Sequence, residues 1–177
     1  MSSFRTQVDH TCALDARTLR AARALLDAVF GAEMTDHAWD HALGGMHVLV
    51  WEAEQLVAHA SVVQRRLLYR GRALQTGYIE GVAVRADRRE RGYGAAMMDA
   101  LERIVRGAYE LGALGASDAG AGFYGARGWR AWQGQTWALT PAGLIRTEDD
   151  AIYVLEVAVA LDLSGELTCD WREGDIW

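Results

Sequence analysis

Residues 82–95 combine the residue types that bind phosphate groups. A strand-like apolar run is followed by an arginine-rich loop containing Arg89 and Arg91, and a predicted helix opens at Gly92 and Gly94. Backbone N–H groups at a helix N-terminus lack intrahelical partners, and the helix dipole adds positive potential there. Glycines let the backbone approach a pyrophosphate closely, and arginines add fixed charge. The pattern predicts a site for a phosphate-bearing cofactor.

Two other interpretations of this turn are weaker. Gly92 and Gly94 could begin a dinucleotide-binding fingerprint, but its third glycine position is Met97. The turn also follows several strands that look antiparallel, whereas that fingerprint opens a βαβ unit. The second alternative is a glycine-opened helix beside a solvated arginine loop, with no ligand.

Glu80 is the second candidate for chemistry. It lies in a strongly apolar strand directly before Gly81. A carboxylate in such a strand is costly unless it is paired or hydrated. A glycine inside a strand indicates a bulge or a close backbone approach. We therefore expect Glu80 at an opening in the sheet, as a general base, as a carboxylate that binds a substrate cation, or as part of a structural salt bridge.

The composition is that of a globular protein with a substantial core. The chain has 177 residues, of which 51% are hydrophobic and 24% charged, and we expect one domain. All 18 basic residues are arginine, which excludes a P-loop lysine and a Schiff-base lysine. The only cysteines, Cys12 and Cys169, form neither a disulfide framework nor a zinc site, so we expect a reducing, cytoplasmic location. We expect no signal peptide and no membrane span.

The net charge of −6 is concentrated near the C-terminus. Residues 146–177 contain Arg146 and Arg172 but nine acidic residues, namely Glu148, Asp149, Asp150, Glu156, Asp162, Glu166, Asp170, Glu173 and Asp175. Such a segment repels nucleic acid and attracts cations. The alternative is a solvated acidic surface with no ligand.

Hydrophobic periodicity predicts an α/β chain. Helices are expected over residues 14–30, from Thr35 or Asp36 to the glycines at 44–45, over 92–111 and over 119–127. Strands are expected over residues 4–9, 46–51, 56–68, 74–84, 114–116, 129–132, 135–139 and 152–163. This order indicates a mixed central sheet that is antiparallel first and crosses over through helices later.

The turn and its context resemble a known superfamily. Arg89-x-x-Gly92-x-Gly94 after the strand resembles motif A of the GNAT N-acetyltransferases. The segments 41–47, 77–85, 107–113, 124–129 and 169–177 are similar to the aminoglycoside 2′-N-acetyltransferases within it. The resemblance implies a GNAT fold, with a mixed sheet flanked by helices and splayed between the fourth and fifth strands. It further implies a single domain over 1–177, in which 146–177 completes the substrate site.

The resemblance also implies a cofactor and residue roles. The cofactor would be acetyl-CoA, and transfer would be direct within a ternary complex, with Glu80 as general base and Tyr124 as general acid. Contacts to coenzyme A are expected from Val82, Ala83, Val84, Arg89, Arg91, Gly92, Tyr93, Gly94 and Ala95. Contacts to substrate are expected from Glu33, Gly81, Ser117, Asp149 or Asp150, Asp175 and Trp177, the last through its carboxylate. No metal is expected.

The implied partner is a polycationic small molecule, an aminoglycoside, and neither a nucleic acid nor a membrane. Members of the resembled family are typically homodimers, so we expect a homodimer here. Two alternatives stay open: the same fold acetylates another cationic amine, such as a polyamine or an amino sugar, or the chain is a non-catalytic CoA-binding module.

Overall fold

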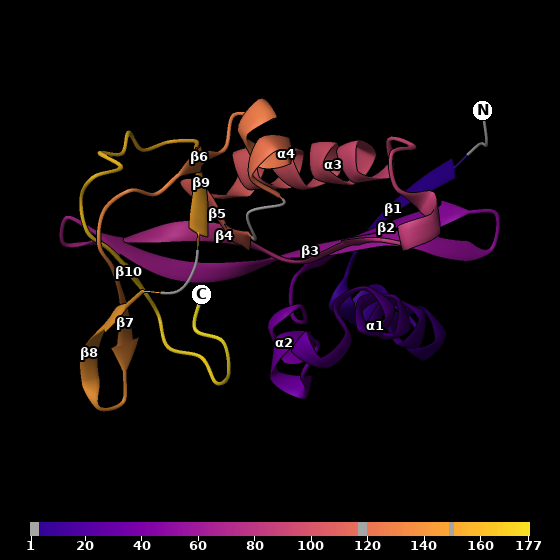
Figure 1. Cartoon of the computed structure of the whole chain (residues 1–177), viewed down its shortest axis with the longest axis horizontal. Helices are drawn as coiled ribbons and strands as arrows, with labels where there is room; N and C mark the ends of the chain where they lie inside the picture. The colour runs from indigo at the N-terminus through magenta and orange to yellow at the C-terminus, as the bar shows by residue number, and fades with distance from the viewer. Residues whose placement is uncertain (1–3, 117–119, 149–150) are drawn as a thin grey trace. The chain divides into compact units, whose positions relative to one another are not determined.

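The computed structural model describes residues 4–116, 120–148 and 151–177 (Figure 1). The chain divides into two compact units. The first comprises Met1–Val63 and Ile79–Arg103, and the second comprises Gln64–Tyr78 and Ile104–Trp177. Strands β3 (Gln55–Tyr69) and β4 (Arg72–Val84) and helix α3 (Tyr93–Ala108) each contribute residues to both units.

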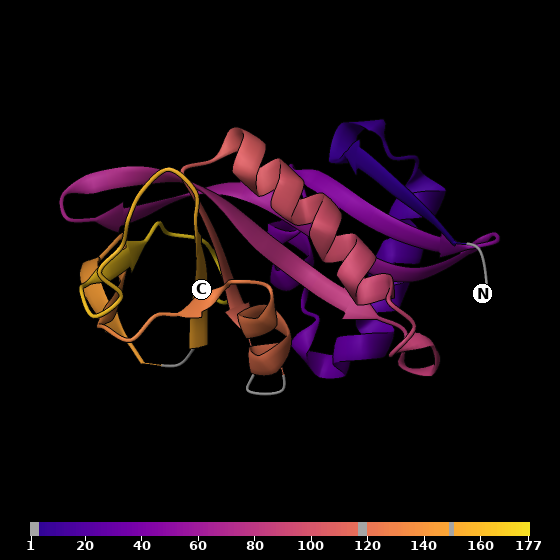
Figure 2. The same cartoon turned by 90° about the horizontal axis from the view of Figure 1, so that it is seen from above.

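The first unit begins with three antiparallel strands. Strand β1 (Phe4–His10) pairs with β2 (Met46–Glu52), and β2 pairs with the first half of β3. The centre of β2, Val48–Val50, is fully buried. Helices α1 (Ala16–Phe30) and α2 (Asp36–His41) lie on one side of these strands, and the start of α3 lies on the other (Figures 1 and 2). Both faces of β2 and of the first half of β3 are therefore covered, which explains their nearly continuous apolar sequence, whereas β1 is polar and mostly exposed.

Helix α1 shows why the sequence periodicity was informative. The Asp15 side chain caps its N-terminus by accepting a hydrogen bond of 2.7 Å from the Thr18 backbone N–H. The buried face of the helix contains Ala22, Leu25 and Leu26, which belong to a core cluster with Leu14, Leu49, Leu56 and Ala83. The helix ends at Gly31, whose φ of 58° suits glycine.

The second unit is a mixed sheet. Its strand order is β6-β9-β5-β4-β3-β10-β7-β8. The strands not yet introduced are β5 (Leu111–Ala116), β6 (Arg130–Ala131), β7 (Thr136–Thr140), β8 (Gly143–Thr147), β9 (Ala151–Glu156) and β10 (Leu167–Cys169), and helix α4 spans Ala121–Ala126. The parallel pairing of β5 with β4 covers Thr76–Tyr78 and Leu111–Ala113, although β5 continues to Ala116 and β4 to Val84. The pairing of β10 with β7 is also parallel.

The predicted α/β class with a mixed sheet is confirmed, and most of the predicted elements are present. The strand expected over residues 152–163 is wrong in its second half, because β9 ends at Glu156. Beyond it, the Leu161 N–H donates to the Glu156 carboxylate and the Asp162 N–H donates to the Tyr69 hydroxyl. These two amides therefore bind side chains and not the main chain of a neighbouring strand. Strands β8 and β10 were not predicted. Within the described ranges, no helix is both long and apolar enough to cross a membrane.

Candidate active site

Gly81 interrupts strand β4 immediately after Glu80. Its φ is 58°, in the left-handed region, and a Cβ atom added to it would lie 3.3 Å from Leu26 Cδ1 and 3.5 Å from His59 Nδ1. The predicted irregularity and close packing are thus both present, since a side chain would be strained by φ and crowded by its neighbours. Glu80 itself is half-buried. The Glu80 carboxylate therefore lies directly beside an irregular backbone position in an otherwise apolar strand.

A chain of buried polar groups ends at the Gly81 carbonyl oxygen. This oxygen lies 3.1 Å from His59 Nδ1, His59 Nε2 lies 3.0 Å from His47 Nδ1, and His47 Nε2 lies 2.8 Å from Thr11 Oγ1. The Gly44 N–H donates to the same Thr11 oxygen at 2.9 Å. The Gly81 carbonyl only accepts, so His59 Nδ1 donates to it, and a neutral His59 then accepts at Nε2 from His47 Nδ1. The Thr11 hydroxyl has two acceptors within reach, His47 Nε2 and the Gly45 carbonyl oxygen at 3.2 Å.

Both imidazoles of this chain are neutral. Burial lowers the pKa of His47 to about 4 and that of His59 to about 3. The sequence analysis did not predict this pair, because the contact depends on the register between β2 and β3. Leu49 is paired with His59 and His47 with Ser61, which makes the two histidines diagonal neighbours on one face.

The predicted phosphate-binding turn connects β4 to α3. A short 3₁₀ helix, Ala86–Arg88, leads into Glu90 and Gly92, which both have positive φ. The Ala96 N–H donates to the Gly92 carbonyl at 3.0 Å. The N–H groups of Tyr93, Gly94 and Ala95 precede this bond and belong to the first turn, where amides lack intrahelical acceptors. No atom lies within 4 Å of a Cβ added at Gly92, so the helix N-terminus is open there.

The arginines of the turn fall into two groups. Arg85 forms an ion pair with Asp87, and Arg88 forms ion pairs with Asp87 and Glu52 at 2.7 Å. Arg89 and Arg91 are exposed, and neither forms an ion pair with any residue that the structure describes. The two arginines predicted to bind the cofactor are therefore those whose charge is available.

The side chain of Tyr93 is held by contacts within the first unit. The ring is buried, packs edge-on against Phe4 with centroids 5.2 Å apart, and its hydroxyl donates to Glu52 at 2.9 Å. These contacts anchor the start of α3 to β1 and β2. In the segment before the turn, Ala83 is buried in the core cluster, while Val82 and Val84 are half-buried.

In the second unit, Tyr124 lies on α4 in an aromatic cluster. It is 7% exposed, and its ring centroid is 6.0 Å from Tyr153 and 6.4 Å from Trp129. Burial raises the pKa of its hydroxyl to about 12. The phenol therefore keeps its proton at neutral pH, as a proton donor must.

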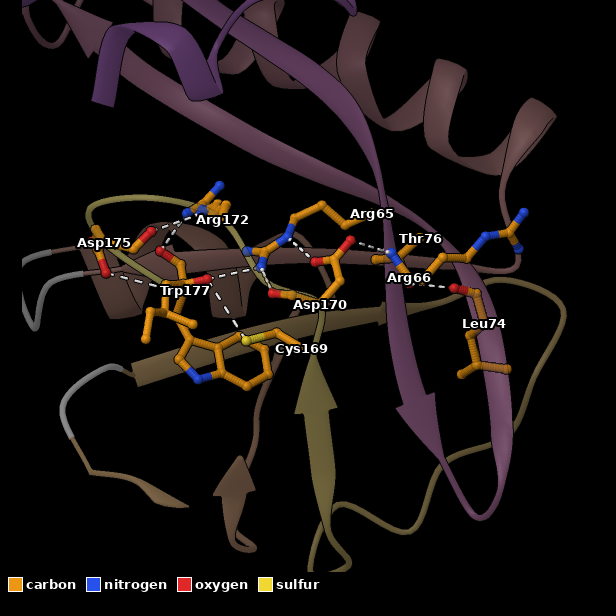
Figure 3. A network of polar contacts seen from close by, with 10 residues as sticks. Arg65, Arg66, Leu74, Thr76, Cys169, Asp170, Arg172, Asp175 and Trp177 are labelled. Carbon is orange, nitrogen blue, oxygen red and sulfur yellow. Dashed lines mark hydrogen bonds and ion pairs between the residues drawn. The ribbon is translucent and has the colours of Figure 1, made fainter. Parts of the chain in front are cut away.

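Asp175 and Trp177 lie in a loop at the end of the second unit (Figure 3). Asp175 is exposed, whereas Trp177 is only 5% exposed. The Trp177 indole N–H donates to Thr147 Oγ1 at 2.8 Å, and its main-chain oxygen accepts from Arg172 at 2.6 Å. Thr147 also lines a cavity of about 610 Å³ together with Trp132, Gln133, Gly134, Gln135, Thr136, Arg146, Glu148 and Ile152. The Trp177 side chain thus has a packing role, and Asp175 offers the accessible carboxylate.

The remaining predicted residues are divided as follows. Glu33 is exposed at the end of a 3₁₀ helix, Gly31–Glu33, in the first unit. Ser117, Asp149 and Asp150 lie outside the described residues. The first unit thus carries Glu33, Glu80, Gly81 and the turn, and the second carries Tyr124, Asp175 and Trp177. The described residues contain no cluster of three or more His, Cys, Asp or Glu side chains able to hold a metal ion.

Comparison with known proteins identifies the family. A model of the acetyltransferase (GNAT) domain matches residues 13–132. This chain belongs to the GNAT acetyltransferase family. It is 51% identical over 174 residues to an aminoglycoside 2′-N-acetyltransferase of Mycolicibacterium fortuitum, which covers 95% of this chain and 89% of that protein.

Solved GNAT structures share the fold. A GNAT family acetyltransferase of Brucella melitensis in complex with acetyl-CoA has a TM-score of 0.64 at 14% identity, covering 94% of this chain and 96% of that one. A GCN5-related N-acetyltransferase of Kribbella flavida has a TM-score of 0.60 at 20% identity, but the match covers 75% of this chain and 34% of that longer one.

The cofactor of a GNAT acetyltransferase is acetyl-CoA. The first unit of this GNAT chain has what a pyrophosphate requires. Arg89 and Arg91 are exposed and form no ion pair with the described residues, and the start of α3 is open at Gly92. The side chains at the turn therefore fit the cofactor that the family uses.

Proposed function

We propose that this GNAT acetyltransferase transfers the acetyl group of acetyl-CoA to the 2′-amine of aminoglycosides. The observation that carries the proposal is the 51% identity, over 95% of the chain, to a protein named for that reaction. The structural support is an exposed acidic residue, Asp175, in the segment that resembles the family's substrate site. The acidic C-terminal segment would steer a polycation toward the protein.

The proposed chemistry assigns one role to each of three groups. Glu80 accepts the proton of the substrate ammonium, directly or through water, because only the neutral amine attacks a carbonyl carbon. The Val82 N–H stabilises the negative charge that develops on the oxygen of that carbonyl as the amine adds. The new N–C bond forms as the C–S bond breaks, and Tyr124 gives its proton to the departing thiolate. The cofactor supplies the thioester that is cleaved.

Cofactor binding is assigned to the turn. Main-chain groups of Val82, Ala83 and Val84 hold the pantetheine arm in the manner of an added strand. The exposed Arg89 and Arg91, with the first-turn amides of Gly92, Tyr93, Gly94 and Ala95, bind the pyrophosphate.

Substrate recognition is assigned to carboxylates and main-chain groups. Glu33, Gly81, Ser117, Asp149 or Asp150, Asp175 and Trp177 contact the aminoglycoside in this proposal. The whole of 1–177 acts as one acetyltransferase domain, with 146–177 completing the substrate site. We further propose that the protein is a homodimer, on the basis of the resemblance. We also propose a cytoplasmic location, because both thiols, Cys12 and Cys169, are free.

The test is free-thiol release from acetyl-CoA with two aminoglycosides. Tobramycin carries a 2′-amine and kanamycin A a 2′-hydroxyl, so we expect turnover with tobramycin alone. Turnover with both would retain acetyl transfer but reject the 2′ position. Turnover with neither, while acetyl-CoA still raised Tm, would favour another amine, such as a polyamine or an amino sugar, or a non-catalytic CoA-binding module. Glu80→Gln should lower kcat about 100-fold if Glu80 is the base. The exposed Glu54→Gln, outside the turn, is the control.

A further inference from the structure

One buried guanidinium binds both ends of the C-terminal loop. Arg65, on β3, is only 4% exposed. Its Nε donates to Asp170 Oδ1 at 2.7 Å, and its Nη2 donates to the main-chain oxygens of Asp170 at 2.9 Å and Ile176 at 2.8 Å (Figure 3). The remaining Asp170 oxygen accepts from the Arg66 backbone N–H at 3.1 Å. The Arg65 side chain thus joins the two ends of the segment 170–176 by hydrogen bonds.

A second arginine, Arg172, forms hydrogen bonds between residues of this loop. Arg172 Nε donates to the Asp175 main-chain oxygen at 2.8 Å, and Nη2 donates to that of Trp177. Gly174, with a φ of 79°, supplies the turn between them. The guanidinium carbons of Arg65 and Arg172 lie 4.7 Å and 5.3 Å from the centre of the Tyr78 ring. The loop thus has a defined shape rather than the freedom of a chain end.

Stability alone does not explain an arginine at position 65. A buried charge is costly, and apolar residues can replace buried ion pairs without loss of stability. Within the described part of the chain, Arg65 Nη1 is buried and has no hydrogen-bond partner, which adds to that cost. Only a planar guanidinium can meet the side-chain and main-chain oxygens of Asp170 and the oxygen of Ile176 at once, which a lysine ammonium cannot do. We therefore attribute the arginine at position 65 to the geometry of these three contacts.

The shaped loop presents one carboxylate. Asp175 is exposed, and its Oδ1 lies 3.4 Å from the Trp177 N–H, a long hydrogen bond. Its main-chain oxygen is held by Arg172, while the buried Trp177 indole is fixed on Thr147. The backbone on both sides of the carboxylate is therefore fixed, and the carboxylate itself can accept a cation.

We propose that Arg65 is a positioning residue for substrate recognition, which fixes the loop 170–177 so that the Asp175 carboxylate meets an ammonium group of the substrate. This inference rests on the proposed function. It adds to that function a residue that acts through Asp175 and does not itself touch the substrate.

The test compares Arg65→Met with Arg66→Met. Arg66 is the adjacent residue of the same strand, has an exposed side chain, and binds Asp170 through its backbone, which the substitution leaves unchanged. Arg65→Met should raise the KM for tobramycin about tenfold or more while leaving the KM for acetyl-CoA within twofold. Arg66→Met should leave both constants within twofold. Equal effects on both KM values, or no effect, would overturn the proposal.

A double-variant cycle separates positioning from general damage. If Arg65 acts through Asp175, Arg65→Met combined with Asp175→Asn should be no worse than the more severe single variant. Multiplying effects would contradict the proposal. Hydrogen exchange of the 170–177 amides should accelerate in Arg65→Met and not in Arg66→Met, and slow exchange in both would reject the positioning role. Failure of the wild type to acetylate tobramycin would reject the proposed function and, with it, the substrate role of Asp175.

Discussion

His47 Nδ1 lies 3.0 Å from His59 Nε2, and neither ring is exposed to solvent. His59 in turn contacts the carbonyl oxygen of Gly81, the residue after Glu80. Because the chain of donors ends at a carbonyl oxygen, which holds no proton to pass on, it cannot deliver protons to or from Glu80. Its effect is to fix the Gly81 peptide, where the backbone of β4 has a positive φ.

Removing the His59 ring should destabilise the protein. In His59→Leu the Gly81 carbonyl and the His47 Nδ1–H both lose their partner while buried, which should cost about 2–4 kcal/mol of unfolding free energy. Urea denaturation measures this. The exposed His37 on α2 provides the control, since His37→Leu should be nearly neutral. Equal stabilities of the two variants would show that the buried chain contributes nothing.

Lowering the pH should destabilise the folded protein because His47 and His59 take up protons on unfolding. The folded-state pKa values, about 4 for His47 and about 3 for His59, lie below the value of 6.5 in the unfolded chain. The unfolded state therefore binds more protons below pH 6.5, and stability falls from there toward pH 3–4, by at most about 2.7 kcal/mol per pH unit for two protons. The double variant His47→Leu/His59→Leu should have a flatter profile of unfolding free energy between pH 7 and 4. His37→Leu should keep the wild-type slope.

Tyr124→Phe should lower kcat with little change in stability. If the hydroxyl protonates the thiolate, its loss should cost about 100-fold in kcat. Because its pKa is raised to about 12, ionisation of Tyr124 should not lower the wild-type rate below about pH 10. Tyr153→Phe keeps the neighbouring ring and should stay within threefold of wild type. A Tyr124→Phe enzyme with unchanged kcat would remove the residue from the mechanism.

The arginines of the turn should differ in their effect on acetyl-CoA binding. Arg89→Gln removes an exposed charge that forms no ion pair with the described residues, and should raise the KM for acetyl-CoA about tenfold. Arg85→Gln removes a guanidinium already paired with Asp87 and should change this KM less than threefold. The effect of Arg89→Gln should shrink as salt is added, because exposed charges are screened. Identical effects of the two substitutions would show that the ion pairs do not decide cofactor binding.

Much of the fold could be predicted because it is encoded by neighbouring residues. The 3.6-residue repeat and the capping by Asp15 and Thr35 place α1 and α2. The apolar runs place β2, β3 and β4, and Gly81 within β4 predicts the positive φ and close packing that the structure contains. The turn before α3 was also predictable, because glycines and arginines there are consecutive.

Contacts between residues far apart in the chain could not be determined from the sequence alone. Strand β10 has three residues and exists because β3 and β7 pair with it, and β9 ends at Glu156 because side chains capture the amides that follow. Likewise, Arg65 reaches Ile176 across 111 positions. Local sequence determined most of the helices and strands and which side chains could do chemistry. Only the tertiary structure decided which arginines are paired, which histidines meet and which carboxylate stays accessible, because burial and strand register depend on the whole chain.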